Sequence, residues 1–144
     1  MVDMEARLQN AMEDITGNES LLEMLDEEAA AEMLDWGKST VTFLVNQTDG
    51  LDDAAAELAL DSRLKAVRQF IRSAGNWAAG KYVDPDDRLQ LREKLLGHAK
   101  QIFGADASLP SAEEMDAVLN QMDAQQNTPR QLVLNLKELF NEAR

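Results

Sequence analysis

Apolar residues recur every three or four positions along most of the chain, and this spacing limits the fold more than any other feature. An α-helix turns once in 3.6 residues, so such residues form one continuous face along it. The two longest stripes comprise Leu22, Leu25, Ala29, Met33, Trp36, Thr40 and Phe43, and then Ala56, Leu60, Leu64, Val67, Ile71, Ala74 and Ala78. No segment alternates convincingly between apolar and polar residues, as a half-buried strand would. We therefore predict an all-α protein.

Signals for helix ends divide the chain further. Asp49-Gly50 predicts a turn between the two long stripes, and Gly80 fits the end of the second. Within the first long stripe, Asp26 is an alternative helix start and Gly37 an alternative bend. Three later starts are predicted at Asp84-Pro85, at Ser111 with Glu114, and at Thr128-Pro129. The expected architecture is a bundle of about six helices, built on a long antiparallel helical hairpin, in a single domain over residues 1–144.

Charge is distributed unevenly along the chain, whose net charge is −13. Acidic residues concentrate in residues 1–61, whereas residues 62–104 carry an excess of Lys and Arg. In the predicted hairpin the acidic helix faces the basic helix. The expected neighbours are Glu27 with Arg72, Glu32 with Arg68, and Asp35 with Lys65 or Arg63. The alternative is an exposed basic stripe of Lys65, Arg68 and Arg72 for an anionic partner. Direct nucleic-acid binding is not expected of so acidic a chain.

The stretch SAGNWAAG, residues 73–80, surrounds a tryptophan with small side chains. Small residues let a neighbouring helix approach closely, and the indole of Trp77 then fills the remaining gap. The alternative is a pocket beside Trp77 or Trp36 for an aromatic or lipid-like ligand. The candidate ligand or partner contacts are Trp36, Arg68, Arg72, Asn76, Trp77 and Tyr82.

Familiar catalytic and cofactor patterns are missing from the sequence. The chain has no cysteine and one histidine, His98, and it contains no phosphate-binding glycine loop or nucleophile-elbow motif. A calcium loop built on Gly50 fails, because Val45 and Ala56 would stand where calcium needs oxygen ligands. We therefore expect no catalytic residue, metal or cofactor, and no enzymatic activity.

The N-terminus is polar and acidic, unlike a secretory signal, and the longest apolar stretch, residues 40–45, is too short to cross a bilayer. A soluble, cytoplasmic protein without membrane contact is expected. The favoured hypothesis is a non-enzymatic protein–protein interaction module: a small regulator, adaptor or assembly factor. One alternative is an acidic surface that occupies a partner's basic site in imitation of nucleic acid. Another is a helical bundle that binds a small molecule or lipid near Trp77. The partner is expected to be another, unidentified protein, and a homodimer is left open.

Overall fold

The computed structural model describes residues 3–17, 25–124 and 126–144, and within these ranges the chain forms helices and no strand. The predicted all-α fold of six helices is confirmed. The helices are α1 (Met4–Thr16), α2 (Glu27–Asn46), α3 (Asp53–Ala78), α4 (Pro85–Phe103), α5 (Ala112–Leu119) and α6 (Pro129–Leu139). Short 3₁₀ turns follow α5 at Asn120–Asp123 and α6 at Asn141–Ala143.

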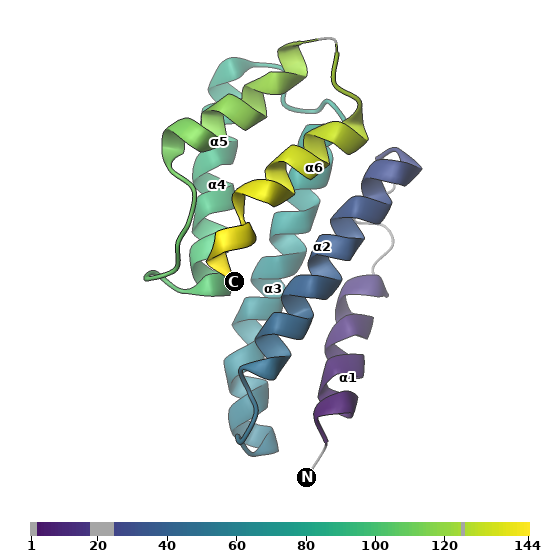
Figure 1. Cartoon of the computed structure of the whole chain (residues 1–144), viewed down its shortest axis with the longest axis vertical. Coiled ribbons are helices and arrows are strands. Elements are labelled where there is room, and N and C mark those ends of the chain that lie inside the picture. The colour runs from purple at the N-terminus through teal and green to yellow at the C-terminus, as the bar shows by residue number, and fades with distance from the viewer. Residues whose placement is uncertain (1–2, 18–24, 125) are drawn as a thin grey trace.

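Helices α2 and α3 form the predicted antiparallel hairpin, which runs along the length of the molecule (Figure 1). Their connection contains Gly50 with a φ of 84°, a conformation that glycine adopts more readily than other residues. Asp26 is the residue before α2, so the alternative start at this position is confirmed. Leu22, the first residue of the predicted stripe, lies outside the described residues.

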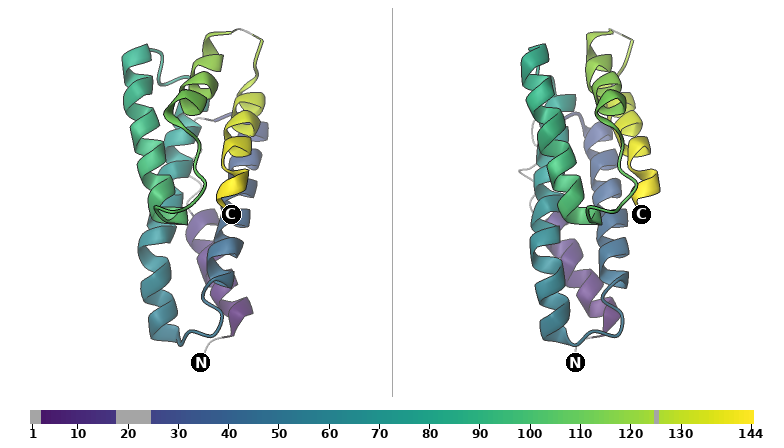
Figure 2. Two further views of the ribbon diagram at one scale, coloured as in Figure 1. Left: turned by 60° about the vertical axis from the view of Figure 1, so that its left-hand side comes forward. Right: turned by 90° about the vertical axis from the view of Figure 1, so that its left-hand side faces the viewer.

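The remaining helices cover the hairpin in two groups, which Figure 2 separates clearly. Helix α1 lies along the half of the hairpin nearest the α2–α3 connection, and we call this the open half. Helices α4, α5 and α6 cover the other half, which we call the wrapped half. There α4 packs on α3, α6 packs on α2, and α5 bridges α4 and α6.

Aromatic side chains fill the core of the wrapped half. Trp36 stacks on Phe70 with ring centroids 4.5 Å apart, and Phe140 meets Phe70 edge-on at 5.1 Å. Phe103 adds a further edge contact to Trp36 at 6.4 Å. Because these rings come from α2, α3, α4 and the end of α6, one cluster holds four segments together.

Gly37 lies where α1, α2 and α3 converge. A Cβ atom at this position would lie 2.7 Å from Ile71 Cδ1 and 3.3 Å from Ile15 Cγ2. Helix α2 continues through Gly37 to Asn46, so the glycine does not end the helix. The physical reason for the glycine is close packing, because its missing side chain makes room for the two isoleucines.

The predicted starts of the later helices are confirmed by their caps. The Ser111 hydroxyl accepts a hydrogen bond from Glu114 N at 3.1 Å, and Ser111 N donates to Glu114 Oε1 at 3.0 Å. Asp84 and Thr128 each accept a hydrogen bond from a backbone N–H of the helix that follows them. These side chains satisfy N–H groups that have no partner within the helix, which fixes where each helix begins.

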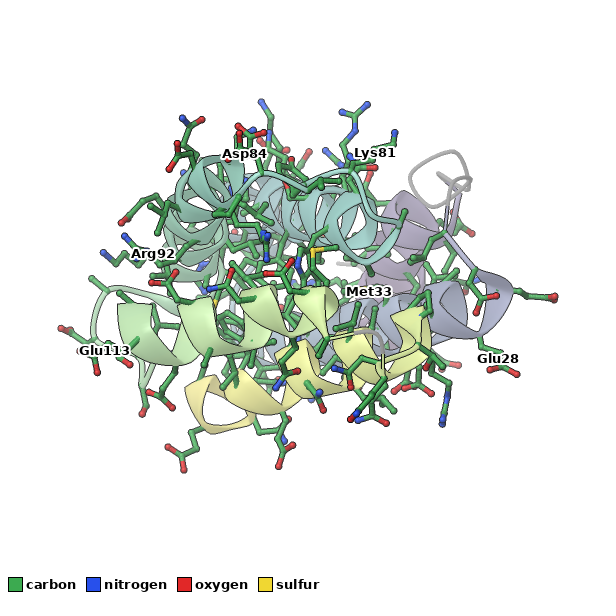
Figure 3. All side chains as sticks on the ribbon, turned by 90° about the horizontal axis from the view of Figure 1, so that it is seen from above. Glu28, Met33, Lys81, Asp84, Arg92 and Glu113 are labelled. Atoms are coloured by element: carbon green, nitrogen blue, oxygen red, sulfur yellow. The ribbon has the colours of Figure 1, made fainter. Side chains whose placement is uncertain are left out.

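Most charged side chains point outward from the bundle, while most core positions are apolar. Seen from above, Glu28 and Glu113 project from the periphery, whereas Met33 lies among the helices (Figure 3). The exposed fraction of Met33 is 1%. This division of polar and apolar faces is the one that the helical spacing predicts.

Candidate functional site

A groove of about 550 Å³ runs between α1 and the open half of α3. Its floor is apolar and consists of Ala11 from α1 with Ala56, Leu60 and Leu64 from α3. The three residues from α3 are spaced by four positions, so they follow one face of that helix. The groove therefore follows the inner face of α3, with these apolar residues at its base and polar or charged residues along the rest of its lining.

The packing of α1 explains why the groove stays open. Helix α1 packs chiefly against α2, with Ala11 and Ile15 on its buried face. Two of the four floor positions are alanines, whose side chains are too short to close the space between α1 and α3. In the wrapped half, by contrast, α4 packs closely along α3.

Arg7 closes one end of the groove and is almost entirely buried. Its guanidinium donates to Thr48 O at 2.9 Å and to Leu51 O at 2.6 Å, both in the α2–α3 connection. It also forms an ion pair with Asp53 at 3.1 Å. These contacts compensate the charge of Arg7 and tie α1 to the connection between α2 and α3.

Arg68 lines the groove at the other end of its α3 wall. It forms an ion pair with Asp14, which joins α3 to α1. Both cations of the groove lining are thus engaged with carboxylates of the lining itself. Neither is left to attract an anion from solution.

Glu57 and Asp61 supply the uncompensated charge of the rim. Both carboxylates are exposed, and neither forms an ion pair or side-chain hydrogen bond with a described residue. They lie one helical turn apart on α3, next to the floor residues Leu60 and Leu64. The groove therefore combines an apolar floor with a negatively charged rim.

The predicted ion pairs between α2 and α3 are wrong. Glu32 instead contacts Lys137 at 3.0 Å and Arg130 at 3.6 Å, and Asp35 contacts Lys137 at 3.3 Å. Helix α6 lies on α2 and supplies these cations. The prediction considered only the two helices of the hairpin, so it did not include them. Arg68 pairs with α1, and Arg63 donates a hydrogen bond to Gln47. Glu27, Lys65 and Arg72 are exposed and form no ion pair with a described residue.

The predicted contact residues are dispersed, and of the six only Arg68 lines the groove. Trp77 is completely buried, and its Nε1 donates to Leu119 O at 3.0 Å, so it packs α3 against α5. Trp36 is buried in the aromatic cluster, and its Nε1 has no hydrogen-bond partner among the described residues. Asn76 and Tyr82 are half-buried, and Arg72 is exposed.

Two buried arginines were missed from the sequence. Arg88 is 3% exposed and forms a two-point ion pair with Asp123 at 2.8 and 3.0 Å. It also donates to Asn120 and to Val83 O, which joins α4 to the turn after α5. Their spacing in the sequence could have indicated this burial. Arg88 precedes Leu91 by three residues and Arg7 precedes Ala11 by four, so each arginine lies on an apolar helix face.

His98 lies on α4, away from the groove, and is half-buried. Burial lowers its pKa below the usual 6.5, and the positive charge of Lys94 lowers it further. The pKa of the Asp123 carboxyl is also lowered, but the cause is different, because Arg88 donates hydrogen bonds to it. Neither group belongs to the groove lining.

Within the described residues, no group of three or more His, Cys, Asp or Glu side chains is arranged to hold a metal ion. In the same part of the chain, every helix is too short or too polar to cross a bilayer. Comparison of the chain with family models, curated proteins and solved structures found no match.

Proposed function

We propose that the chain is a protein–protein interaction module that binds a segment of a partner protein in the groove between α1 and α3. The observation that carries the proposal is the apolar floor of Ala11, Ala56, Leu60 and Leu64 beneath a charged rim. Interfaces commonly have an apolar centre and a polar edge. Ala11, Ala56 and Leu60 are already largely buried, so a partner's apolar side chains would remove from water mainly the exposed part of Leu64, which favours association.

The residue types of the lining support binding more than catalysis. The lining contains no Ser, Thr, Cys, Tyr, Lys or His, so it offers no hydroxyl, thiol or amine nucleophile and no imidazole base. Its arginines are engaged by Asp53 and Asp14. The remaining polar groups, Asn10 and the rim carboxylates, are suited to orienting a bound partner.

The alternative of a nucleic-acid mimic receives less support. It requires Asp26, Glu27, Glu28, Glu32 and Asp35 to form one outward acidic stripe. Lys137 lies against both Glu32 and Asp35, so part of this charge is neutralised within the molecule. Asp26, Glu27 and Glu28 remain exposed, so the acidic surface left for a basic partner is reduced mainly to these three residues.

A matched pair of substitutions on α3 tests the proposal. Leu64 lines the groove, whereas Leu58 is 81% exposed and lies outside it. The full chain and its Leu64→Gln and Leu58→Gln variants serve as baits in a lysate of the organism that encodes the chain. We expect a partner that the wild type and the Leu58→Gln variant retain and the Leu64→Gln variant loses. Circular dichroism checks that both variants fold.

Two results would contradict the proposal. One is the absence of any retained protein. The other is a partner that is insensitive to Leu64→Gln and lost with Leu58→Gln, because that result would place the interface on the outer face of α3.

A further inference from the structure

We infer that the occupant of the groove is an amphipathic α-helix of the partner protein, with Lys or Arg side chains beside its apolar face. This inference rests on the proposed function and narrows it to one class of partner. It follows from three properties of the groove: the backbone of its walls, the length of its floor and the charge of its rim.

The walls of the groove favour a helical occupant. They are two α-helices, whose backbone N–H and C=O groups are hydrogen-bonded internally except at the helix ends. A partner segment over the apolar floor must therefore satisfy its own backbone groups, as an α-helix does. Strand addition needs a sheet edge, and the described residues form no strand. Polyproline segments dock in aromatic-lined grooves, and this lining contains no aromatic residue.

The floor has the length that such a helix requires. From Ala56 to Leu64 along α3 is about 12 Å, at a rise of 1.5 Å per residue. Side chains at positions i, i+4 and i+7 of a partner helix span about 10 Å, and this is the usual spacing of anchors that dock in a groove. The ion pairs of Arg7 with Asp53 and Arg68 with Asp14 frame the two ends. We therefore place the partner's apolar side chains along the floor, between these two ion pairs.

The rim determines the charge of the partner. Glu57 and Asp61 lie on the same side of α3, one turn apart, and are not neutralised by a described residue. Lys or Arg side chains spaced by three or four positions on the partner helix would meet both carboxylates. A phosphate-rich partner would be repelled by the same pair. Complementary charge at a rim mainly improves the rate and specificity of association.

Selection from displayed peptide libraries tests this inference with the full-length chain. One library presents helices with variable apolar anchors and with Lys, Glu or Gln at the flanking positions, and a second presents extended proline-containing peptides. Binders retained by the Leu64→Gln variant are discarded, so the surviving peptides depend on the groove. We expect helices enriched in Lys at positions three or four apart.

The affinity of the selected helix is then measured for two double variants. Glu57→Gln with Asp61→Asn removes the rim charge, and Glu138→Gln with Glu142→Gln removes two exposed carboxylates outside the groove. We expect the rim variant to bind about fivefold more weakly, since each exposed ion pair contributes modestly. The control should bind as the wild type does. Rising salt should erase the difference between the two variants.

The outcomes separate the inference from the proposed function. Selected helices without a preference for Lys, or extended peptides in their place, would overturn the inference and leave the groove as a binding site. The absence of any peptide that depends on Leu64 would overturn the proposed function as well. Dimerisation that Leu64→Gln abolishes, measured by sedimentation, would assign the groove to a second copy and overturn the inference. The rim double variant keeps the test valid if Leu64→Gln unfolds the chain.

Discussion

The wrapped and open halves of the α2–α3 hairpin differ in what covers them, although the same two helices run through both. In the wrapped half, three helices close over rings from four segments, including Trp36, Phe70 and Phe140. In the open half, α1 is the only described helix that lies on the hairpin, and a groove remains between α1 and α3.

This difference suggests that the wrapped half mainly stabilises the fold, whereas the open half binds the partner. Large interlocking side chains in the wrapped half bury apolar area that several helices share, which stabilises the fold. In the open half, small side chains such as Ala11 and Ala56 leave space, and polar contacts of Arg7 and Arg68 hold α1 in place. A surface that is less completely covered is available to a partner.

The largest effect is expected from Leu95→Ala in the wrapped half. Leu95 is completely buried on α4. Its truncation should lower the free energy of unfolding by about 3–5 kcal/mol, because the surrounding helices cannot collapse into the space. Denaturant unfolding of the full chain measures this loss. A loss under about 1 kcal/mol would mean that the wrapped half is loosely packed.

The same truncation of leucine to alanine in the open half should lower the free energy of unfolding by a smaller amount. Leu60 lies on the groove floor and is 8% exposed. Leu60→Ala should lower the free energy of unfolding by about 2 kcal/mol, because the space created joins the groove instead of forming a closed cavity. If Leu60→Ala and Leu95→Ala cost the same, the proposed contrast between the two halves would be wrong.

The meeting point of three helices is tested by Gly37→Ala, with Gly97→Ala as its control. The new methyl group at Gly37 would press on Ile71 Cδ1, whereas a Cβ at Gly97 meets nothing within 4 Å. Overpacking at Gly37 should exceed the gain in helix propensity and destabilise the fold by about 1 kcal/mol. Gly97→Ala should stabilise it by about 0.5–1 kcal/mol. Thermal unfolding shifts of the same sign would contradict this account.

The smallest expected effect is a pH dependence from His98. Its pKa in the folded chain is lowered, chiefly by burial and then by Lys94, so the unfolded chain binds a proton more readily. Stability should therefore fall as the pH drops through about 6.5 towards the lower folded pKa. Denaturant unfolding across this range should show a loss that His98→Gln removes. If the free energy of unfolding depends on pH in the His98→Gln variant as it does in the wild type, His98 makes no such contribution.

Much of the fold was predictable because local signals fix helix ends. Asp84, Ser111 and Thr128 begin helices where the sequence placed them, since capping depends on neighbours within one turn. Apolar spacing likewise marked most of the core. These features need no knowledge of how the helices are arranged.

The ion pairs and the groove were not predictable, because both depend on which helices become neighbours. Glu32 pairs with Lys137, which lies more than a hundred residues later in the chain, and Arg68 pairs with Asp14 on α1. The groove exists because α1 packs chiefly on α2 and leaves a gap beside α3, and Ala56 and Leu60 lie at the base of this gap. A sequence pattern identifies the apolar face of α3 but not the part of it that remains open.

Hydrogen exchange of the full chain, with and without its captured partner or selected helix, tests the central claim most directly. The account predicts that binding slows exchange in α1 and in residues 53–68 of α3, and leaves α4, α5 and α6 nearly unchanged. Slower exchange confined to α4–α6, with none in α1 or α3, would contradict it.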